Sequence, residues 1–170
     1  MDLTQTKIAF RKFAKETQKQ ARANITRKDL KASGRLRNDL KFYTKESKNS
    51  IELIYERPLY ADFQDRGVSG KEVKYQTPFK YTTKKPPAKV FEKWAKQKGI
   101  KPRSSKTGRF MTFKAFGFIV SRNIFRRGIK PKQFFIKPFE RQTQNLPEPI
   151  LDAFNMDIDK FLNETFNATS

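Results

Sequence analysis

The sequence predicts an α+β fold in which an antiparallel β-sheet packs against helices, with a long helix near each end of the chain. Two short stretches alternate apolar and polar residues on either side of a polar segment, which is the pattern of a β-hairpin. Regions near both ends instead repeat apolar residues every three or four positions, as amphipathic helices do. With 170 residues and 17 phenylalanines, the chain is long enough to form a single domain with a hydrophobic core.

The N-terminal helix is predicted over residues 3–22. A narrow apolar face suits a helix at the periphery, lying on a sheet or on a neighbouring subunit. Thr26 followed by Asp29 resembles a capping box and predicts that a second, short helix starts there. Residues 1–32 are therefore interpreted as an N-terminal helical arm. The residues of the narrow face are Leu3, Phe10, Phe13, Ala14, Thr17 and Ala21.

The first part of the core is predicted over residues 33–69. Its hairpin strands are expected at residues 40–45 and 51–55, joined by a polar turn. Pro58 is placed where the first turn of a helix tolerates proline, so a short helix follows and ends at Gly67.

Residues 70–109 are predicted to be a basic insertion that contains one helix. Fourteen basic and two acidic residues lie between Arg66 and Arg109. The helix is expected over residues 88–98 and ends at Gly99. Its predicted inner face consists of Val90, Phe91, Trp94 and Ala95.

The loops on both sides of that helix carry many like charges and few apolar residues. We expect them to become fully ordered only in an assembly, and we expect Gly70 to tolerate substitution as a loop residue.

The second part of the core is predicted over residues 110–170 and is organised around a helix from Thr112 to Arg127. Phenylalanines on two sides of this helix indicate cover from more than one neighbour and hence a central position. Gly128 is expected to end the helix in a left-handed conformation. After it, residues 133–136 are predicted to form a short buried strand that Pro138 ends.

A further helix is predicted to begin within residues 138–145 and to be broken by Pro147 and Pro149, after which the C-terminal helix shows the strongest helical periodicity. From Pro147 to Ser170 there are five acidic residues and one basic residue, a net charge of −4. Because the whole chain has a net charge of +21, the first 146 residues carry a net charge of +25. This acidic segment can pair with its own basic body or with the next copy, or it can simply be a solvated face.

The net charge of +21 indicates a polyanionic partner, either nucleic acid or an acidic protein surface. The absence of an apolar run of transmembrane length and of an N-terminal signal sequence predicts a soluble protein that stays inside the cell unless it leaves in an assembly.

No enzymatic activity and no cofactor or metal are expected, because the chain has no histidine and no cysteine. The remaining catalytic hypothesis is a magnesium-dependent nuclease that uses Asp62, Asp65 and Glu72. We favour the simpler interpretation, in which Asp62 and Asp65 form the exposed face of a short helix.

Two sets of residues are candidates for binding. Aromatic residues and positions in the predicted strand are candidates for contact with subunits or other partners: Phe79, Tyr81, Trp94, Phe110, Phe134, Phe135 and Phe139. Basic residues of the insertion are candidates for contact with DNA or an acidic partner: Lys74, Lys80, Lys84, Lys85, Lys101, Arg103, Lys106 and Arg109. For Phe79 and Tyr81, contact with protein is favoured over base stacking.

Several motifs occur in a definite order along the chain. The hairpin precedes Tyr60–Val68 (YADFQDRGV), and Gly128–Pro131 (GIKP) precedes Phe134–Phe139 (FFIKPF). This order resembles the head-tail joining or tail-completion proteins of tailed bacteriophages, in which a tyrosine-alanine helix follows the first strands. Residues 33–42 also resemble that family's approach to its first strand, and the resemblance spans about residues 33–165.

The resemblance implies helices on an antiparallel sheet and a virion protein that forms a ring around the DNA channel at the head-tail interface, after assembly in the host cytoplasm. Implied partners are identical copies, neighbouring neck, portal-side or tail proteins, and packaged DNA contacted through phosphates, with no membrane. The sequence departs from shorter members in its 70–109 insertion and in reading FIKPF at residues 135–139. The alternative is a free-standing, non-sequence-specific nucleic-acid-binding accessory protein.

Overall fold

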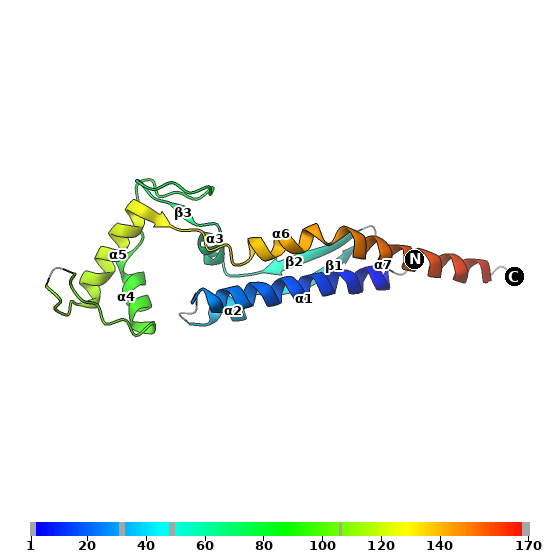
Figure 1. The fold of residues 1–170 in the computed structure, drawn as a ribbon, viewed down its shortest axis with the longest axis horizontal. Coiled ribbons are helices and arrows are strands. Elements are labelled where there is room, and N and C mark those ends of the chain that lie inside the picture. Colours follow the sequence, from blue (N-terminus) through cyan, green and yellow to red (C-terminus); the bar gives the residue numbers. More distant parts are fainter. Residues whose placement is uncertain (1–2, 31–32, 48–49, 106, 168–170) are drawn as a thin grey trace. The chain divides into compact units, whose positions relative to one another are not determined.

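A computed structural model describes residues 3–30, 33–47, 50–105 and 107–167 of the protein (Figure 1). The predicted α+β class is confirmed, with helices and two antiparallel two-stranded pairs. The chain divides into two compact units instead of a single domain. We call residues 1–27, 38–57 and 134–170 the terminal unit, and residues 28–37 and 58–133 the middle unit. The middle unit thus contains the predicted 70–109 segment together with residues 28–37, 58–69 and 110–133.

The terminal unit consists of α1 (Thr4–Arg27), a hairpin of β1 (Lys41–Ser47) and β2 (Ser50–Glu56), α6 (Ile136–Gln144) and α7 (Pro147–Asn167). The hairpin pairs in the register Lys41↔Glu56 to Ser47↔Ser50, so the two predicted strands are confirmed. Figure 1 shows α1 running along these elements, and it contacts α6, α7 and both strands.

Helix α1 is the centre of the terminal unit, so its predicted peripheral position is wrong. Ala14, Thr17, Ala21 and Ile25 are fully buried, and Phe13 is nearly so. The face is narrow because small side chains let the neighbouring elements approach α1 closely. The predicted helix start at Thr26 is also wrong, since α1 continues to Arg27 and Asp29 has a positive φ of 49°.

The middle unit contains α3 (Tyr60–Asp65), β3 (Val68–Ser69), α4 (Ala88–Gln97), α5 (Phe113–Arg127) and β4 (Gly128–Ile129), while α2 (Arg35–Asn38) lies at a chain boundary between the units. The short helix that ends at Gly67 is confirmed, as α3. The end of α4 is confirmed too, because Gly99 has a φ of 65° and the Ile100 amide donates to the Ala95 carbonyl (2.9 Å).

Helix α5 packs through small residues, and its predicted central position is wrong. Its buried residues are Gly117 and Ser121, whereas the Phe118 side chain is 58% exposed. A Cβ at Gly117 would lie 2.7 Å from the Ala88 carbonyl oxygen, and the Ser121 hydroxyl donates to the Pro86 carbonyl (2.5 Å). Close approach of α4 and α5 therefore leaves large side chains outside the contact.

The predicted inner face of α4 is wrong for the same reason. Only its small member, Ala95, is buried, whereas Val90 is 57% and Trp94 37% exposed. Phe91 is half-buried.

The predicted strand at residues 133–136 is wrong. Phe134 and Phe135 precede α6, which begins at Ile136, and Pro138 lies in the first turn of that helix. Proline is tolerated there because first-turn amides have no partner within the helix. The short extended segment after α5 is β4 instead, so Gly128 both ends the helix and starts a strand.

Gly128 adopts the predicted positive φ, at 74°, although its ψ of −166° differs from the left-handed helical value. A Cβ there would collide with the Val68 carbonyl oxygen and lie 2.6 Å from the Gly70 amide nitrogen. The prediction that Gly70 tolerates substitution is wrong, because Gly70 is buried and a Cβ would lie 2.6 Å from the Arg126 carbonyl carbon. Two glycines are therefore required where the backbones of β3 and β4 meet.

Candidate functional site

The two motif segments at residues 60–68 and 128–131 meet in the middle unit. Val68 pairs with Ile129, and Ser69 pairs with Gly128, in the antiparallel β3–β4 ladder. The Lys132 amide donates to the Gln64 carbonyl (2.9 Å), which ties the end of α3 to the chain after Pro131. We call residues 60–70 together with residues 126–133 the motif junction.

A glycine and a buried residue at the end of α3 tie the two sides of the junction together. Gly67 has a φ of 77°, and a Cβ there would lie 2.6 Å from the Ile129 carbonyl oxygen. Asp65 is fully buried, and its backbone carbonyl accepts a hydrogen bond from the Gln133 amide (2.9 Å). The interpretation of Asp65 as part of an exposed helix face is thus wrong, because this residue belongs to the packed interior.

The loop from Gly70 to Tyr81 is anchored to the junction by the chain's own hydrogen bonds. The Tyr81 amide donates to the Ser69 carbonyl (2.9 Å), and the Ser69 amide donates to the Phe79 carbonyl (2.8 Å). The Phe79 ring packs edge-on against Phe63 at 4.8 Å between centroids. These contacts hold the loop against residues of its own unit.

Tyr81 and Lys85 pack against the same aromatic ring. Tyr81 lies 6.2 Å from the Phe125 centroid, and the Lys85 ammonium group lies 5.9 Å from that ring. Burial raises the pKa of Tyr81 above its ordinary value. The aromatic residues of this loop therefore pin it to its own unit.

The predicted basic residues form an exposed set on the loops of the middle unit. Lys74 donates to the Gly70 carbonyl (3.0 Å), and the Arg103 guanidinium lies 4.3 Å from the Phe110 ring centroid. We call the exposed members of this set the basic loop residues: Lys74, Lys80, Lys84, Lys85, Lys101, Arg103 and Arg109. Lys106, which was also predicted, lies outside the described residues.

The predicted aromatic contact residues divide into exposed and buried side chains. Phe110 is 64% exposed and remains a candidate for partner contact, as does Trp94 on α4. Phe134 is fully buried and Phe135 is 7% exposed, so the expectation that they contact a partner is corrected to a role in the core of the terminal unit. Phe139 is 37% exposed and packs edge-on against Phe13 at 5.9 Å.

The residues of the nuclease hypothesis do not assemble. Glu72 is in an ion pair with Arg126 at 2.5 Å, which raises the pKa of that arginine, and Asp65 is buried. Within the described ranges, no group of three or more acidic side chains is placed to hold a metal ion. In the same ranges, no helix is both long and apolar enough to cross a membrane.

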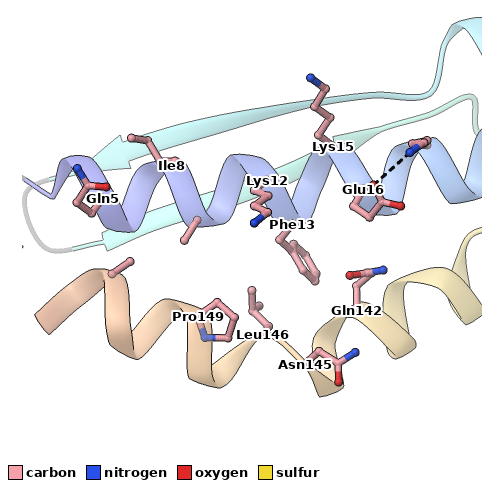
Figure 2. Close-up of a pocket in the computed structure, with 13 residues that line it drawn as sticks. Gln5, Ile8, Lys12, Phe13, Lys15, Glu16, Gln142, Asn145, Leu146 and Pro149 are labelled. Carbon is pink, nitrogen blue, oxygen red and sulfur yellow. Dashed lines mark ion pairs between the residues drawn. The ribbon is translucent and has the colours of Figure 1, made fainter. Parts of the chain in front are cut away.

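The terminal unit carries a groove of about 680 Å³ between α1 and the α6–α7 segment. Figure 2 shows Phe13 of α1 and Leu146 of the α6–α7 link pointing toward each other across it. Three lysines of α1 also line the groove, namely Lys12, Lys15 and Lys19, and Lys19 is paired with Glu16 at 3.8 Å. Sequence reasoning missed this groove because it treated α1 as a peripheral arm.

The groove wall formed by α7 is fixed by an acid that sequence reasoning also missed. The Asp157 carboxylate accepts hydrogen bonds from the backbone amides of Gln5 and Thr6 (2.9 Å each) and from the Thr6 hydroxyl (2.8 Å). Desolvation raises the pKa of Asp157, but these hydrogen bonds and the charge of Lys160 outweigh it, so the pKa lies below its ordinary value. The available signal in the sequence was an acid among the apolar residues of the C-terminal helix.

Comparisons with protein-family models, with curated proteins and with solved structures found no match for this chain.

Proposed function

We propose that this chain is a structural virion protein of a tailed bacteriophage, a ring subunit of the head-tail connector or neck beside the DNA channel. The observation that carries the proposal is the motif junction. Val68, at the end of the first motif, and the adjacent Ser69 pair with Ile129 and Gly128 of the second, although about sixty residues separate the two motifs in sequence. Their pairing supports interpreting the motifs as parts of one structural element instead of two unrelated similarities.

The basic loop residues support contact with DNA through phosphates. All seven are exposed, whereas Phe79 and Tyr81 pack on aromatic rings of their own unit. Rings that are engaged in this way are poorly placed to stack bases, so charge neutralisation is the interaction the surface favours. A channel protein that must let DNA of any sequence pass needs this kind of contact.

Exposed apolar residues of the middle unit support contact with other subunits or neck proteins. Phe118 and Ile119 on α5 are 58% and 45% exposed, and Phe110 is 64% exposed. Exposed apolar surface of this kind is often covered by a partner in an assembled state.

The second candidate is a free-standing nucleic-acid-binding accessory protein, which the net charge of +21 favours by itself. Both candidates bind DNA without sequence preference. They differ in whether the protein is retained in the finished particle.

The deciding experiment is quantitative mass spectrometry of purified particles of the phage that encodes the chain. We expect several copies per virion, in a fixed ratio to the portal protein. Absence from particles that are complete and infectious would contradict the neck proposal and favour the accessory protein.

DNA binding is tested separately with the purified chain. Affinity should fall steeply with salt, and Lys84→Ala with Lys85→Ala should reduce the slope of log K against log salt by about 0.9 for each phosphate that is no longer neutralised. The matched control is Lys137→Ala, an exposed lysine of α6, which should leave the slope unchanged. A footprint at a defined sequence that survives high salt would contradict contact through phosphates alone.

A further inference from the structure

Helix α7 of the terminal unit carries several exposed apolar side chains. Leu151, Phe154, Phe161 and Leu162 are between 39% and 59% exposed. Their spacing of i, i+3, i+10 and i+11 places them on one side of the helix. We call these four residues the α7 stripe.

The stripe is distinct from the side of α7 that packs on α1. Ala153 and Asp157 are buried, at 8% and 2% exposure, and Asp157 caps the first turn of α1. The ten residues after Asp157 therefore run past the start of α1 for about 15 Å at the usual helical rise. Figure 1 shows this end of α7 extending beyond α1, and every residue from Asp159 to Phe166 is exposed.

Acidic residues border the stripe. Glu148, Asp152 and Asp159 follow the spacing i, i+4 and i+11, which aligns them along one edge of the apolar residues, and all three are exposed. A surface that covers the stripe must therefore combine an apolar floor with a basic rim. Pairing of two stripes with each other would place these acids near one another and is disfavoured.

The groove of the terminal unit has that combination. Phe13, Leu146 and Pro149 contribute apolar lining (Figure 2). Lys12, Lys15 and Lys19 also line the groove and follow the spacing i, i+3 and i+7 along α1. Lys12 and Lys19 are seven residues apart, and so are Asp152 and Asp159. Both pairs therefore span about 10 Å along their helices, so two aligned helices can bring the four charges together as two opposite pairs.

We infer that the α7 stripe of one copy of this chain docks into the α1/α6–α7 groove of the next copy. The contact is heterologous, because the stripe and the groove are different surfaces of one unit. Repetition of such a contact generates a closed ring when the rotation between copies closes, and an open filament otherwise. The inference rests on the proposed ring function, for which it supplies the subunit contact.

The test uses the purified full-length chain and two charge-reversed variants, studied by analytical ultracentrifugation over a range of concentrations. The groove variant carries Lys12→Glu and Lys19→Glu, and the stripe variant carries Asp152→Lys and Asp159→Lys. All four positions are exposed, so both variants should fold, which circular dichroism verifies.

We expect the unsubstituted chain to form oligomers. Each variant alone should associate at least about 100-fold more weakly, because like charges then oppose each other. An equimolar mixture of the two variants should recover association, since both contacts in an alternating assembly again pair opposite charges. The matched control carries Lys41→Glu and Lys45→Glu on β1, which makes the same change in net charge as the groove variant at exposed positions and should assemble as the unsubstituted chain does.

Three results would overturn the inference. They are an unsubstituted chain that is monomeric at every concentration, a groove variant that assembles normally, and a mixture that fails to recover association. The last two outcomes would assign the stripe to another surface, such as the middle unit or a different protein. Each leaves the detection of the chain in virions as a separate result, so failure of this contact is distinguishable from failure of the proposed function.

Discussion

Replacement of Asp157 by alanine should destabilise the terminal unit, because this carboxylate joins α7 to the first turn of α1. The substitution removes three hydrogen bonds to a side chain that is only 2% exposed. Hydrogen bonds to charged groups contribute more than neutral ones, but water can replace part of the interaction at first-turn amides. We therefore expect a loss of about 2 to 3 kcal/mol in the free energy of unfolding.

The measurement is thermal and urea denaturation followed by circular dichroism, at protein concentrations where the chain is monomeric. For a chain of this length the expected loss lowers the melting temperature by about 5 to 10 °C. Glu164→Ala is the matched control, since Glu164 makes an exposed ion pair with Lys160 at 3.8 Å and its replacement should change stability by less than about 0.5 kcal/mol. Equal melting temperatures for Asp157→Ala, the control and the unsubstituted chain would refute the reasoning.

The same contact predicts a pH dependence. The pKa of Asp157 is lowered on folding, so the unfolded chain binds its proton more readily than the folded chain does. The contribution to stability is therefore fully present above the unfolded pKa of about 3.9 and is lost as pH falls through the lower folded pKa. The difference in stability between the unsubstituted chain and Asp157→Asn should shrink below about pH 4, and a difference that grows on acidification would contradict this assignment.

Two further predictions concern the glycines and the phenylalanines. Gly70→Val and Gly128→Val should each lower the melting temperature, because a Cβ at either position meets backbone of the opposite segment. Thermal denaturation of both variants tests this. A Gly70→Val variant with an unchanged melting temperature would show that β3 and β4 do not meet as described. Phe134→Ala should cost about 3 to 5 kcal/mol in urea denaturation because the ring is fully buried, whereas Phe110→Ala, at 64% exposure, should cost less than about 1 kcal/mol. Similar losses for the two phenylalanine variants would contradict the assigned core.

Much of the local structure was predictable because it depends on neighbours in the sequence. Alternation of apolar and polar residues identified both hairpin strands, and helical periodicity identified α1, α5 and α7. Gly99 and Gly128 were recognised as helix ends because the backbone geometry that ends a helix favours glycine. The exposed basic loop residues follow from composition, since lysine and arginine are rarely buried.

The sequence by itself determined the α+β class, most of the elements and the charge of the surfaces, whereas the tertiary structure decided what each element packs against. Phe118 and Trp94 are apolar yet exposed, because α4 and α5 approach each other through Gly117 and Ser121. Periodicity identifies an apolar face, but the residues in contact depend on how closely two backbones approach. The same holds for Asp157, whose partners lie more than 150 residues away and become its neighbours only when α7 folds back on α1.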